Sequence, residues 1–78
     1  MCDADQTIWI TYNGEIYNYK ELKDELNTLG HKFVSESDTE VIINAYKQWG
    51  QDCVTHFNGM WAFCIYDKQS NTFVASRD

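Results

Sequence analysis

The sequence predicts an α+β domain built from antiparallel strands and two main helices. Three observations lead to this prediction: β-branched and aromatic residues gather in short runs, two stretches carry apolar residues every three or four positions, and polar turns separate these elements. The expected order is strand, helix, helix and then a hairpin of two strands. The sequence shows no repeat and no linker, and its 78 residues suit one small domain.

The first strand is expected at residues 7–12, a run of β-branched and aromatic side chains that polar residues precede. Asn13 and Gly14 follow, and the Asn-Gly pair is typical of a turn, so the strand is predicted to end there in an exposed corner. Such a corner can offer a side-chain amide and an unhindered backbone N–H, the two donors that stabilise an oxyanion. A plain turn is the more frequent role, and the residues alone leave both interpretations open.

Two helices are predicted from apolar periodicity. The first begins after Asn18, which has a glutamate three positions later in a capping-box spacing, and it ends at Gly30. The second begins at Ser37 or Asp38, either of which can cap it, and it ends at Gly50. An extended link is expected at residues 31–35. One or two further helical turns are expected at residues 51–57.

The last two strands are expected at residues 60–67 and 72–76, on either side of a polar turn. Nearly every residue from Met60 to Tyr66 is apolar, so both faces of that strand should be covered. Three strands and two helices cover only one face. The chain is therefore expected to be part of a larger fold, and to self-associate or dissolve poorly when it is made alone.

Composition limits the classes of function. Twelve acidic and six basic side chains give a formal charge of -6, which disfavours nucleic acid and anionic membrane surfaces as partners. The apolar runs are far shorter than the roughly 20 residues that span a bilayer. The cysteines and histidines show no metal-ligand spacing, so no metal site is predicted. Three cysteines without a pairing pattern fit a reducing, cytoplasmic compartment.

The thiols and aromatic rings are given structural roles. Cys53 and Cys64 lie in apolar patterns and are predicted to be packed thiols. His31 and His56 are predicted at the surface or half-buried, because neither has a plausible ligand or nucleophile near it in sequence. A place in the core is expected for five aromatic residues, Trp9, Trp49, Phe57, Trp61 and Phe63.

Several linked motifs, in one order and spacing, carry a resemblance to a known family. They are YNGEIYNYKEL at residues 12–22, GHKF at 30–33, SDTEVI at 37–42, NGMWAFCIYD at 58–67 and SRD at 76–78. Over essentially the whole chain they resemble the class II glutamine amidotransferase domain of glutamine-dependent asparagine synthetases, an N-terminal-nucleophile hydrolase. Tyr12 and the run from Glu15 to Asn18 favour this type over hexosamine-forming and purine-forming amidotransferases, which more often carry histidine before the Asn-Gly pair.

The resemblance implies that residues 1–78 form one incomplete domain, an internal part of a four-layer αββα sandwich. It implies a parent enzyme that hydrolyses glutamine and passes ammonia to a separate synthetase domain, where ATP and Mg²⁺ support the amidation of aspartate. Asn13 and Gly14 would form the oxyanion hole and contact the substrate, while Glu15 and Asp38 would hold its α-ammonium group. Asp38 could instead serve only as a helix cap.

The nucleophilic cysteine of that family has no match here. Cys2 is followed by Asp3, whereas family members carry glycine after their N-terminal cysteine. A strand over residues 7–12 would also hold Cys2 roughly 20 Å or more from Asn13. Cys2 is therefore expected to be incidental, and this chain alone to be inactive. Two alternatives are another class II amidotransferase, and a non-catalytic interaction module whose partner covers the second apolar face.

Overall fold

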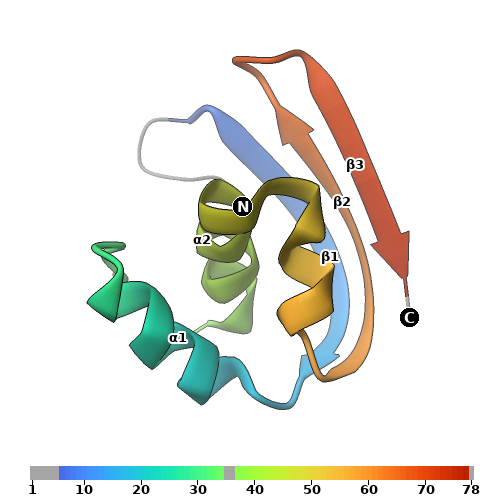
Figure 1. Ribbon diagram of the computed structural model, residues 1–78. Coiled ribbons are helices and arrows are strands. Elements are labelled where there is room, and N and C mark those ends of the chain that lie inside the picture. Colours follow the sequence, from blue (N-terminus) through green and yellow to red (C-terminus); the bar gives the residue numbers. More distant parts are fainter. Residues whose placement is uncertain (1–5, 35–36, 78) are drawn as a thin grey trace.

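The computed structural model describes residues 6–34 and 37–77, which form a three-stranded antiparallel sheet with helices against one of its faces (Figure 1). The predicted α+β class and the predicted order of elements are confirmed. Along the chain the elements are β1 (Ile8–Ile16), α1 (Tyr19–Thr28), α2 (Asp38–Trp49), the 3-10 helix η1 (Gly50–His56), β2 (Gly59–Asp67) and β3 (Thr72–Arg77).

The sheet has the order β1-β2-β3, with β2 in the centre. β1 pairs with β2 along its whole length, from Ile8 opposite Asp67 to Ile16 opposite Gly59. β3 pairs with the other side of β2 through the hairpin. Within the described residues, β1 and β3 are therefore edge strands, each with one row of backbone groups that faces away from the sheet.

The core lies between the sheet and the helices. Alternate residues of each strand point to opposite faces, and those of β1 and β2 that point to the helices are mostly buried. α2 contributes most to this core, because it packs against β1, α1 and η1. The buried apolar side chains are Ile8, Ile10, Ile16, Leu22, Leu26, Val41, Ile42, Ile43, Ala45, Cys53, Phe57, Phe63 and Ile65.

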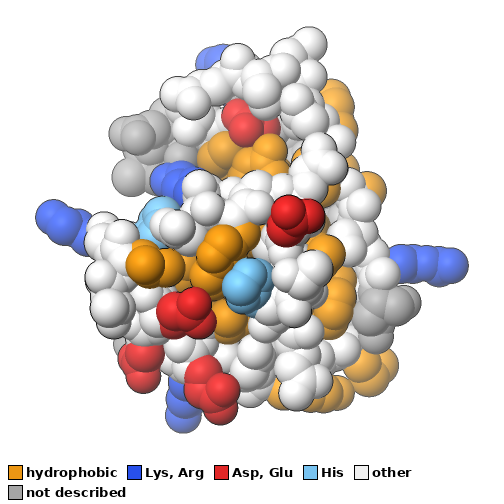
Figure 2. Space-filling model, viewed as in Figure 1, with side chains coloured by type: hydrophobic (Ala, Val, Ile, Leu, Met, Phe, Trp, Pro, Cys, Tyr) orange, Lys and Arg blue, Asp and Glu red, His pale blue; other side chains and the backbone are white. Residues whose placement is uncertain are grey.

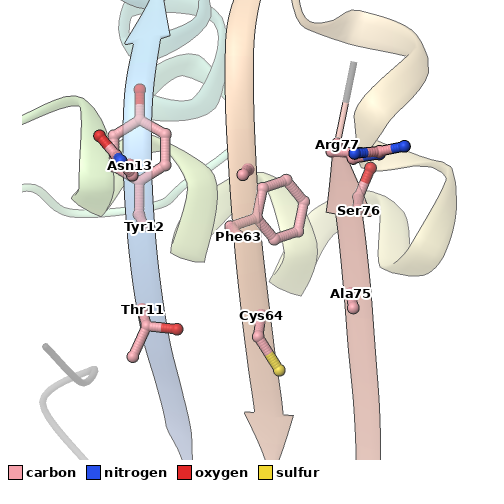
Figure 3. A pocket seen from close by; sticks show the side chains of 9 residues that line it. Thr11, Tyr12, Asn13, Phe63, Cys64, Ala75, Ser76 and Arg77 are labelled. Carbon is pink, nitrogen blue, oxygen red and sulfur yellow. The ribbon is translucent and has the colours of Figure 1, made fainter.

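The opposite, outer face of the sheet carries no helix from the described part of the chain (Figure 1). Small side chains form its middle, and a shallow groove there is lined in part by Ala62, Cys64 and Ala75 (Figure 3). Large apolar residues stand around it: Met60 and Phe73 are 61% and 70% exposed. The apolar run of β2 thus has one face covered by helices and one face open.

The prediction that the first strand ends at an Asn-Gly corner is wrong. β1 continues through Asn13 and Gly14 to Ile16, and Gly14 lies opposite Trp61 in the ladder. Gly14 has a φ of +136°, and a Cβ there would lie 2.8 Å from the Cα of Trp61 and collide with the carbonyl oxygen of Met60. Glycine is therefore needed here for a close approach of two strands, not for a turn.

The helix boundaries agree with the prediction, but one of the caps does not. The Asn18 side chain makes no capping hydrogen bond; its amide donates to the carbonyl of His56 and its Oδ1 accepts from the N–H of Asn58, both at 2.9 Å. These two hydrogen bonds connect the start of α1 to the end of η1. At α2, the Ser37 hydroxyl accepts a first-turn N–H at 3.1 Å, so Ser37 is the cap and Asp38 is the first helical residue.

The predicted packing of thiols and aromatic rings holds in most places. Cys53 is buried as predicted, whereas Cys64 is only partly buried and lies on the open outer face. Trp9 is 43% exposed on that same face, so its assignment to the core is wrong. The other four aromatic residues either belong to the core or pack against it: Phe57, Phe63, Trp49 and Trp61. Both histidines are half-buried, and His56 stacks on Trp49.

The helix side of the molecule has a mixed surface. Figure 2 shows its basic side chains standing apart from one another, with acidic side chains scattered among apolar ones. None of the helices in the described ranges combines the length and the apolar character that a membrane crossing needs.

Candidate functional site

The four site residues proposed from the sequence lie around the end of β1 and the start of α2. Asn13, Gly14 and Glu15 are consecutive strand residues, and Asp38 is the first residue of α2. Because side chains alternate along a strand, those of Asn13 and Glu15 point to the outer face, on which their partners in β2 also lie. Asp38 approaches β1 from the helix side.

The Asp38 carboxylate is held against β1 by two donors. Its Oδ2 accepts a hydrogen bond from the hydroxyl of Tyr12 at 2.8 Å and a longer one from the N–H of Ile16 at 3.4 Å. These two residues flank the three proposed strand residues on either side. The packing of α2 on β1 thus places Asp38 at the same stretch of strand, although the two segments are far apart in sequence.

The alternation of hydrogen bonds in an antiparallel ladder decides which N–H groups of β1 face away from β2. At one end of the ladder the N–H of Lys68 donates to the carbonyl of Thr7 at 2.8 Å. At the other end the N–H of Tyr17 donates to the carbonyl of Asn58 at 2.6 Å. Both pairs continue the register of β1 with β2. Odd-numbered residues of β1 therefore bond to β2, and the N–H groups of even-numbered residues point to the edge that faces away from β2. The portion of this edge at Gly14 and Ile16 is called the free edge of β1.

Two N–H groups at this free edge matter for the site. The N–H of Ile16 is one of them, and it reaches Asp38 rather than β2. Gly14 has the same parity, so its N–H points to the same edge, roughly 6.6 Å along the strand from that of Ile16. The oxyanion donor and the ammonium-binding carboxylate proposed from the sequence therefore face one side of β1.

Asn13 joins this edge only in part. Its side chain belongs to the outer face, where it lines the groove with Thr11, Ala62 and Arg77. In Figure 3 its amide extends past β1 on the side that faces away from β2. In the described part of the chain, no hydrogen bond joins Asp38 to Asn13 or Glu15. The site thus has an edge portion, Gly14 and Asp38, and an outer-face portion, Asn13 and Glu15.

The local electrostatics keep Tyr12 in its donor form. Burial raises the pKa of the Tyr12 hydroxyl well above its usual range, and the hydrogen bond and the negative charge of Asp38 raise it further. The hydroxyl therefore stays a protonated donor at any pH at which enzymes usually work. Sequence reasoning used Tyr12 only as a marker of family type, and it missed this contact because nothing in a sequence pairs a strand residue with a helix start 26 positions later.

The edge carries a carboxylate and an outward-facing backbone N–H, the kinds of group that pair with a cation and with an oxyanion, but the described residues place no nucleophile there. Cys53 is buried in the core, where desolvation raises the pKa of its thiol to about 11. Cys64 lies opposite Thr11 on the outer face. Cys2, which the sequence analysis set aside, lies outside the described residues. A nucleophilic attack at this edge would need a group that these residues do not supply.

Comparison with known proteins connects this geometry to a family. The family model described as "Glutamine amidotransferase domain" matches residues 1–78. The chain is 47% identical over 72 residues to glutamine-hydrolysing asparagine synthetase 3 of Bacillus subtilis, a match that covers 92% of this chain and 12% of that protein. Glutamine-hydrolysing asparagine synthetase of Zea mays is 43% identical over 78 residues, with 100% of this chain and 13% of that protein covered.

A solved structure shows the same fold. The glutamine phosphoribosylpyrophosphate amidotransferase of Bacillus subtilis superposes with a TM-score of 0.76 at 23% identity, over 100% of this chain and 19% of that one. The sheet and helices thus have the fold of the matching part of that amidotransferase. This chain spans only about an eighth of the length of the curated relatives it matches. Its sequence and its fold agree, and the chain belongs to the glutamine amidotransferase domain family.

Proposed function

We propose that this chain is a segment of the glutaminase half of an asparagine-synthetase-like enzyme. Such an enzyme hydrolyses glutamine and delivers the ammonia to an ATP-dependent amidation of aspartate. The free edge of β1 carries the proposal, because the Gly14 N–H and the Asp38 carboxylate face one side of the strand in a chain of the glutamine amidotransferase family. The names of the two similar synthetases support aspartate as the acceptor.

In this proposal Asp38 binds the α-ammonium group of glutamine. Both donors that hold its carboxylate go to Oδ2, and none of the hydrogen bonds of the described residues goes to Oδ1. Oδ1 is therefore the oxygen that can accept an N–H of the substrate. Removing the negative charge would leave the substrate cation unpaired in a partly desolvated site, a cost of about 2 to 5 kcal/mol. Glu15 would add a second carboxylate from the outer face.

Asn13 and Gly14 stabilise the charge that develops during the reaction. A cysteine thiolate attacks the side-chain carbonyl of glutamine, a C–S bond forms, and the carbonyl oxygen becomes an oxyanion. The oxyanion then collapses, the C–N bond breaks, the nitrogen leaves with a proton as ammonia, and water later hydrolyses the thioester. The Asn13 amide and the Gly14 N–H would contact the oxyanion, and each such donor contributes about 2.7 to 4 kcal/mol in comparable sites.

The thiol that attacks is assigned to the N-terminal cysteine of the complete domain, whose own α-amino group would act as the base. Cys53 is buried and Cys64 belongs to the outer face, so neither thiol of the described residues suits this role. The open outer face leaves room for the remainder of the domain, whose second sheet would cover Met60, Phe73 and their neighbours. The proposal thus explains both the open apolar face and the lack of a suitably placed thiol among the described residues.

ATP and Mg²⁺ enter the proposal only through a separate synthetase domain. Within residues 6–34 and 37–77, no three His, Cys, Asp or Glu side chains gather as a metal ion requires. The described residues therefore offer no such group of ligands to Mg²⁺. The chemistry proposed for them contains no step that passes through a nucleotide or a metal.

A chimera tests the proposal directly. In it, the 72 matching residues of this chain replace their counterparts in the full-length Bacillus subtilis synthetase, which supplies every other part of the enzyme. The segment chimera should release ammonia and glutamate from glutamine. The 78-residue chain alone should release none, and an electrophilic glutamine analogue should label none of its cysteines.

Asn13→Ala in the segment chimera should lower the turnover number for glutamine by roughly 10²- to 10³-fold and leave its Michaelis constant nearly unchanged, because the oxyanion exists only along the reaction path. Free ammonia bypasses the site and should support asparagine formation in both proteins. A chimera that uses free ammonia but never glutamine would contradict the proposal and favour an interaction module. Stoichiometric, glutamine-protected labelling of Cys2 in the isolated chain would overturn the assignment of the nucleophile.

A further inference from the structure

The hydroxyl of Tyr12 makes the shorter of the two hydrogen bonds to Asp38. At 2.8 Å it has the usual length of an O–H···O hydrogen bond, whereas the Ile16 N–H at 3.4 Å lies beyond the usual range of an N–H···O bond. Tyr12 is half-buried and packs against the core. Its ring therefore has little freedom, and the hydroxyl is a fixed point to which the carboxylate is attached.

The attachment selects one oxygen of Asp38. Oδ2 accepts both donors, so the Tyr12 bond fixes the plane of the carboxylate: a half-turn would only exchange two equivalent oxygens, whereas a smaller rotation would break the bond. Helix capping does not restrain this side chain, since Ser37 is the cap. Tyr12 thus provides the shorter of the two restraints on the carboxylate, and the other oxygen accepts no hydrogen bond from the described residues.

The protonation of Tyr12 suits this task. Burial, with the hydrogen bond and the charge of Asp38, raises the pKa of the hydroxyl well above its usual range. The hydroxyl therefore cannot become a second negative charge beside Asp38 at any pH at which enzymes usually work. It acts only as a donor, and the negative charge offered to a ligand stays on the aspartate.

A second pair of the same kind provides a matched comparison. Tyr46 donates to Oδ2 of Asp67 at 3.1 Å, and burial with that hydrogen bond likewise raises the pKa of its hydroxyl. Asp67 lies at the opposite end of the β1–β2 ladder from Gly14. Both pairs join α2 to the sheet, so each stabilises the fold, but only the Tyr12 pair adjoins the proposed site.

We propose that Tyr12 is a positioning residue for the substrate ammonium, because its hydroxyl holds Oδ2 of Asp38 and so directs Oδ1 toward the glutamine that binds at the free edge of β1. The inference rests on the proposed function and deepens it. Two residues would then recognise the α-amino group: Asp38 carries the negative charge, and Tyr12 orients the carboxylate.

The test uses the segment chimera and two substrates, glutamine and glutaramate, which is glutamine without its α-amino group. Tyr12→Phe deletes one oxygen and keeps the ring. It should raise the Michaelis constant for glutamine on the order of tenfold, the effect of one hydrogen bond to a charged group, and leave the turnover number within about twofold. The specificity constant for glutaramate should hardly change, so the preference for glutamine should fall about tenfold.

Tyr46→Phe is the matched control, because it removes the same oxygen from the same kind of hydrogen bond away from the site. It should lower thermal stability to a similar extent and leave both substrates unaffected. If Tyr12→Phe loses activity equally toward both substrates, through misfolding or general loosening, the hydroxyl has only a structural role and the inference is overturned.

Asp38→Asn separates failure of this inference from failure of the proposed function. If Asp38→Asn abolishes the preference for glutamine while Tyr12→Phe keeps it, the site stands and the role of Tyr12 is wrong. If Asp38→Asn also keeps the preference, the binding site itself is wrong and the inference falls with it.

Discussion

Replacing Gly14 by alanine should open the ladder between β1 and β2. The new Cβ would lie 2.8 Å from the Cα of Trp61 and collide with the carbonyl oxygen of Met60, both of which are backbone atoms that no side-chain rotation can move. The φ of +136° adds strain for any residue other than glycine, about 1 to 3 kcal/mol. Two or more ladder hydrogen bonds must also weaken, at about 1 kcal/mol each. We expect a total of roughly 3 to 5 kcal/mol.

Gly30→Ala is the control that isolates the collision. Gly30 also has a positive φ, +100°, but a Cβ there would meet nothing within 4 Å. This variant should cost only the backbone strain, partly offset by the lower entropy of the unfolded chain. Hydrogen exchange of β1 and β2 in the segment chimera reports the difference. It should accelerate by roughly 100-fold or more in Gly14→Ala, since about 1.4 kcal/mol corresponds to a factor of ten, and little in Gly30→Ala. Equal exchange in both variants would refute the close approach of the two strands.

Two further predictions concern the chain on its own and its core. The 78-residue chain should self-associate through the open outer face, and Phe73→Lys should reduce this association; a concentrated wild-type sample that sediments as a clean monomer would contradict it. Because the pKa of the Cys53 thiol is raised from 9.0 to about 11, its contribution to stability is complete below pH 9 and is lost as the pH rises toward 11. In urea unfolding of the segment chimera, the free energy of unfolding should fall over this pH range. Cys53→Ala should abolish that pH-dependent fall.

The sequence predicted the elements well because their signals are local. Apolar periodicity located both helices, and runs of β-branched, aromatic and other apolar residues between polar turns located all three strands. Ser37 was correctly named as one of two candidate caps, because a hydroxyl before an acidic first turn has few other roles. The open outer face was predicted for a similar reason. The run from Met60 to Tyr66 is too apolar for a strand with one solvent-exposed face, and two helices can cover only one side of the sheet.

The errors arose where distant segments meet. Asn13 and Gly14 have the composition of a turn, but pairing with β2 overrides that preference, because Gly14 lets two backbones approach closely. Asn18 looks like a cap, yet its amide bonds to the chain near residues 56–58. The link between Tyr12 and Asp38 could not be predicted, because it depends on how α2 lies on β1. For the same reason the sequence named Asp38 as a site residue but could not place it at the strand edge.

The Michaelis constant for glutamine of Asp38→Asn in the segment chimera tests the central claim most directly. If the free edge of β1 binds the substrate ammonium through this carboxylate, the constant should rise roughly 30-fold or more, while ammonia-dependent asparagine formation stays unchanged. Asparagine keeps the shape of the side chain, and Ser37 still caps α2, so thermal stability should fall only slightly. An unchanged Michaelis constant with a clear loss of thermal stability would show that Asp38 only anchors the helix, and it would contradict the proposed site.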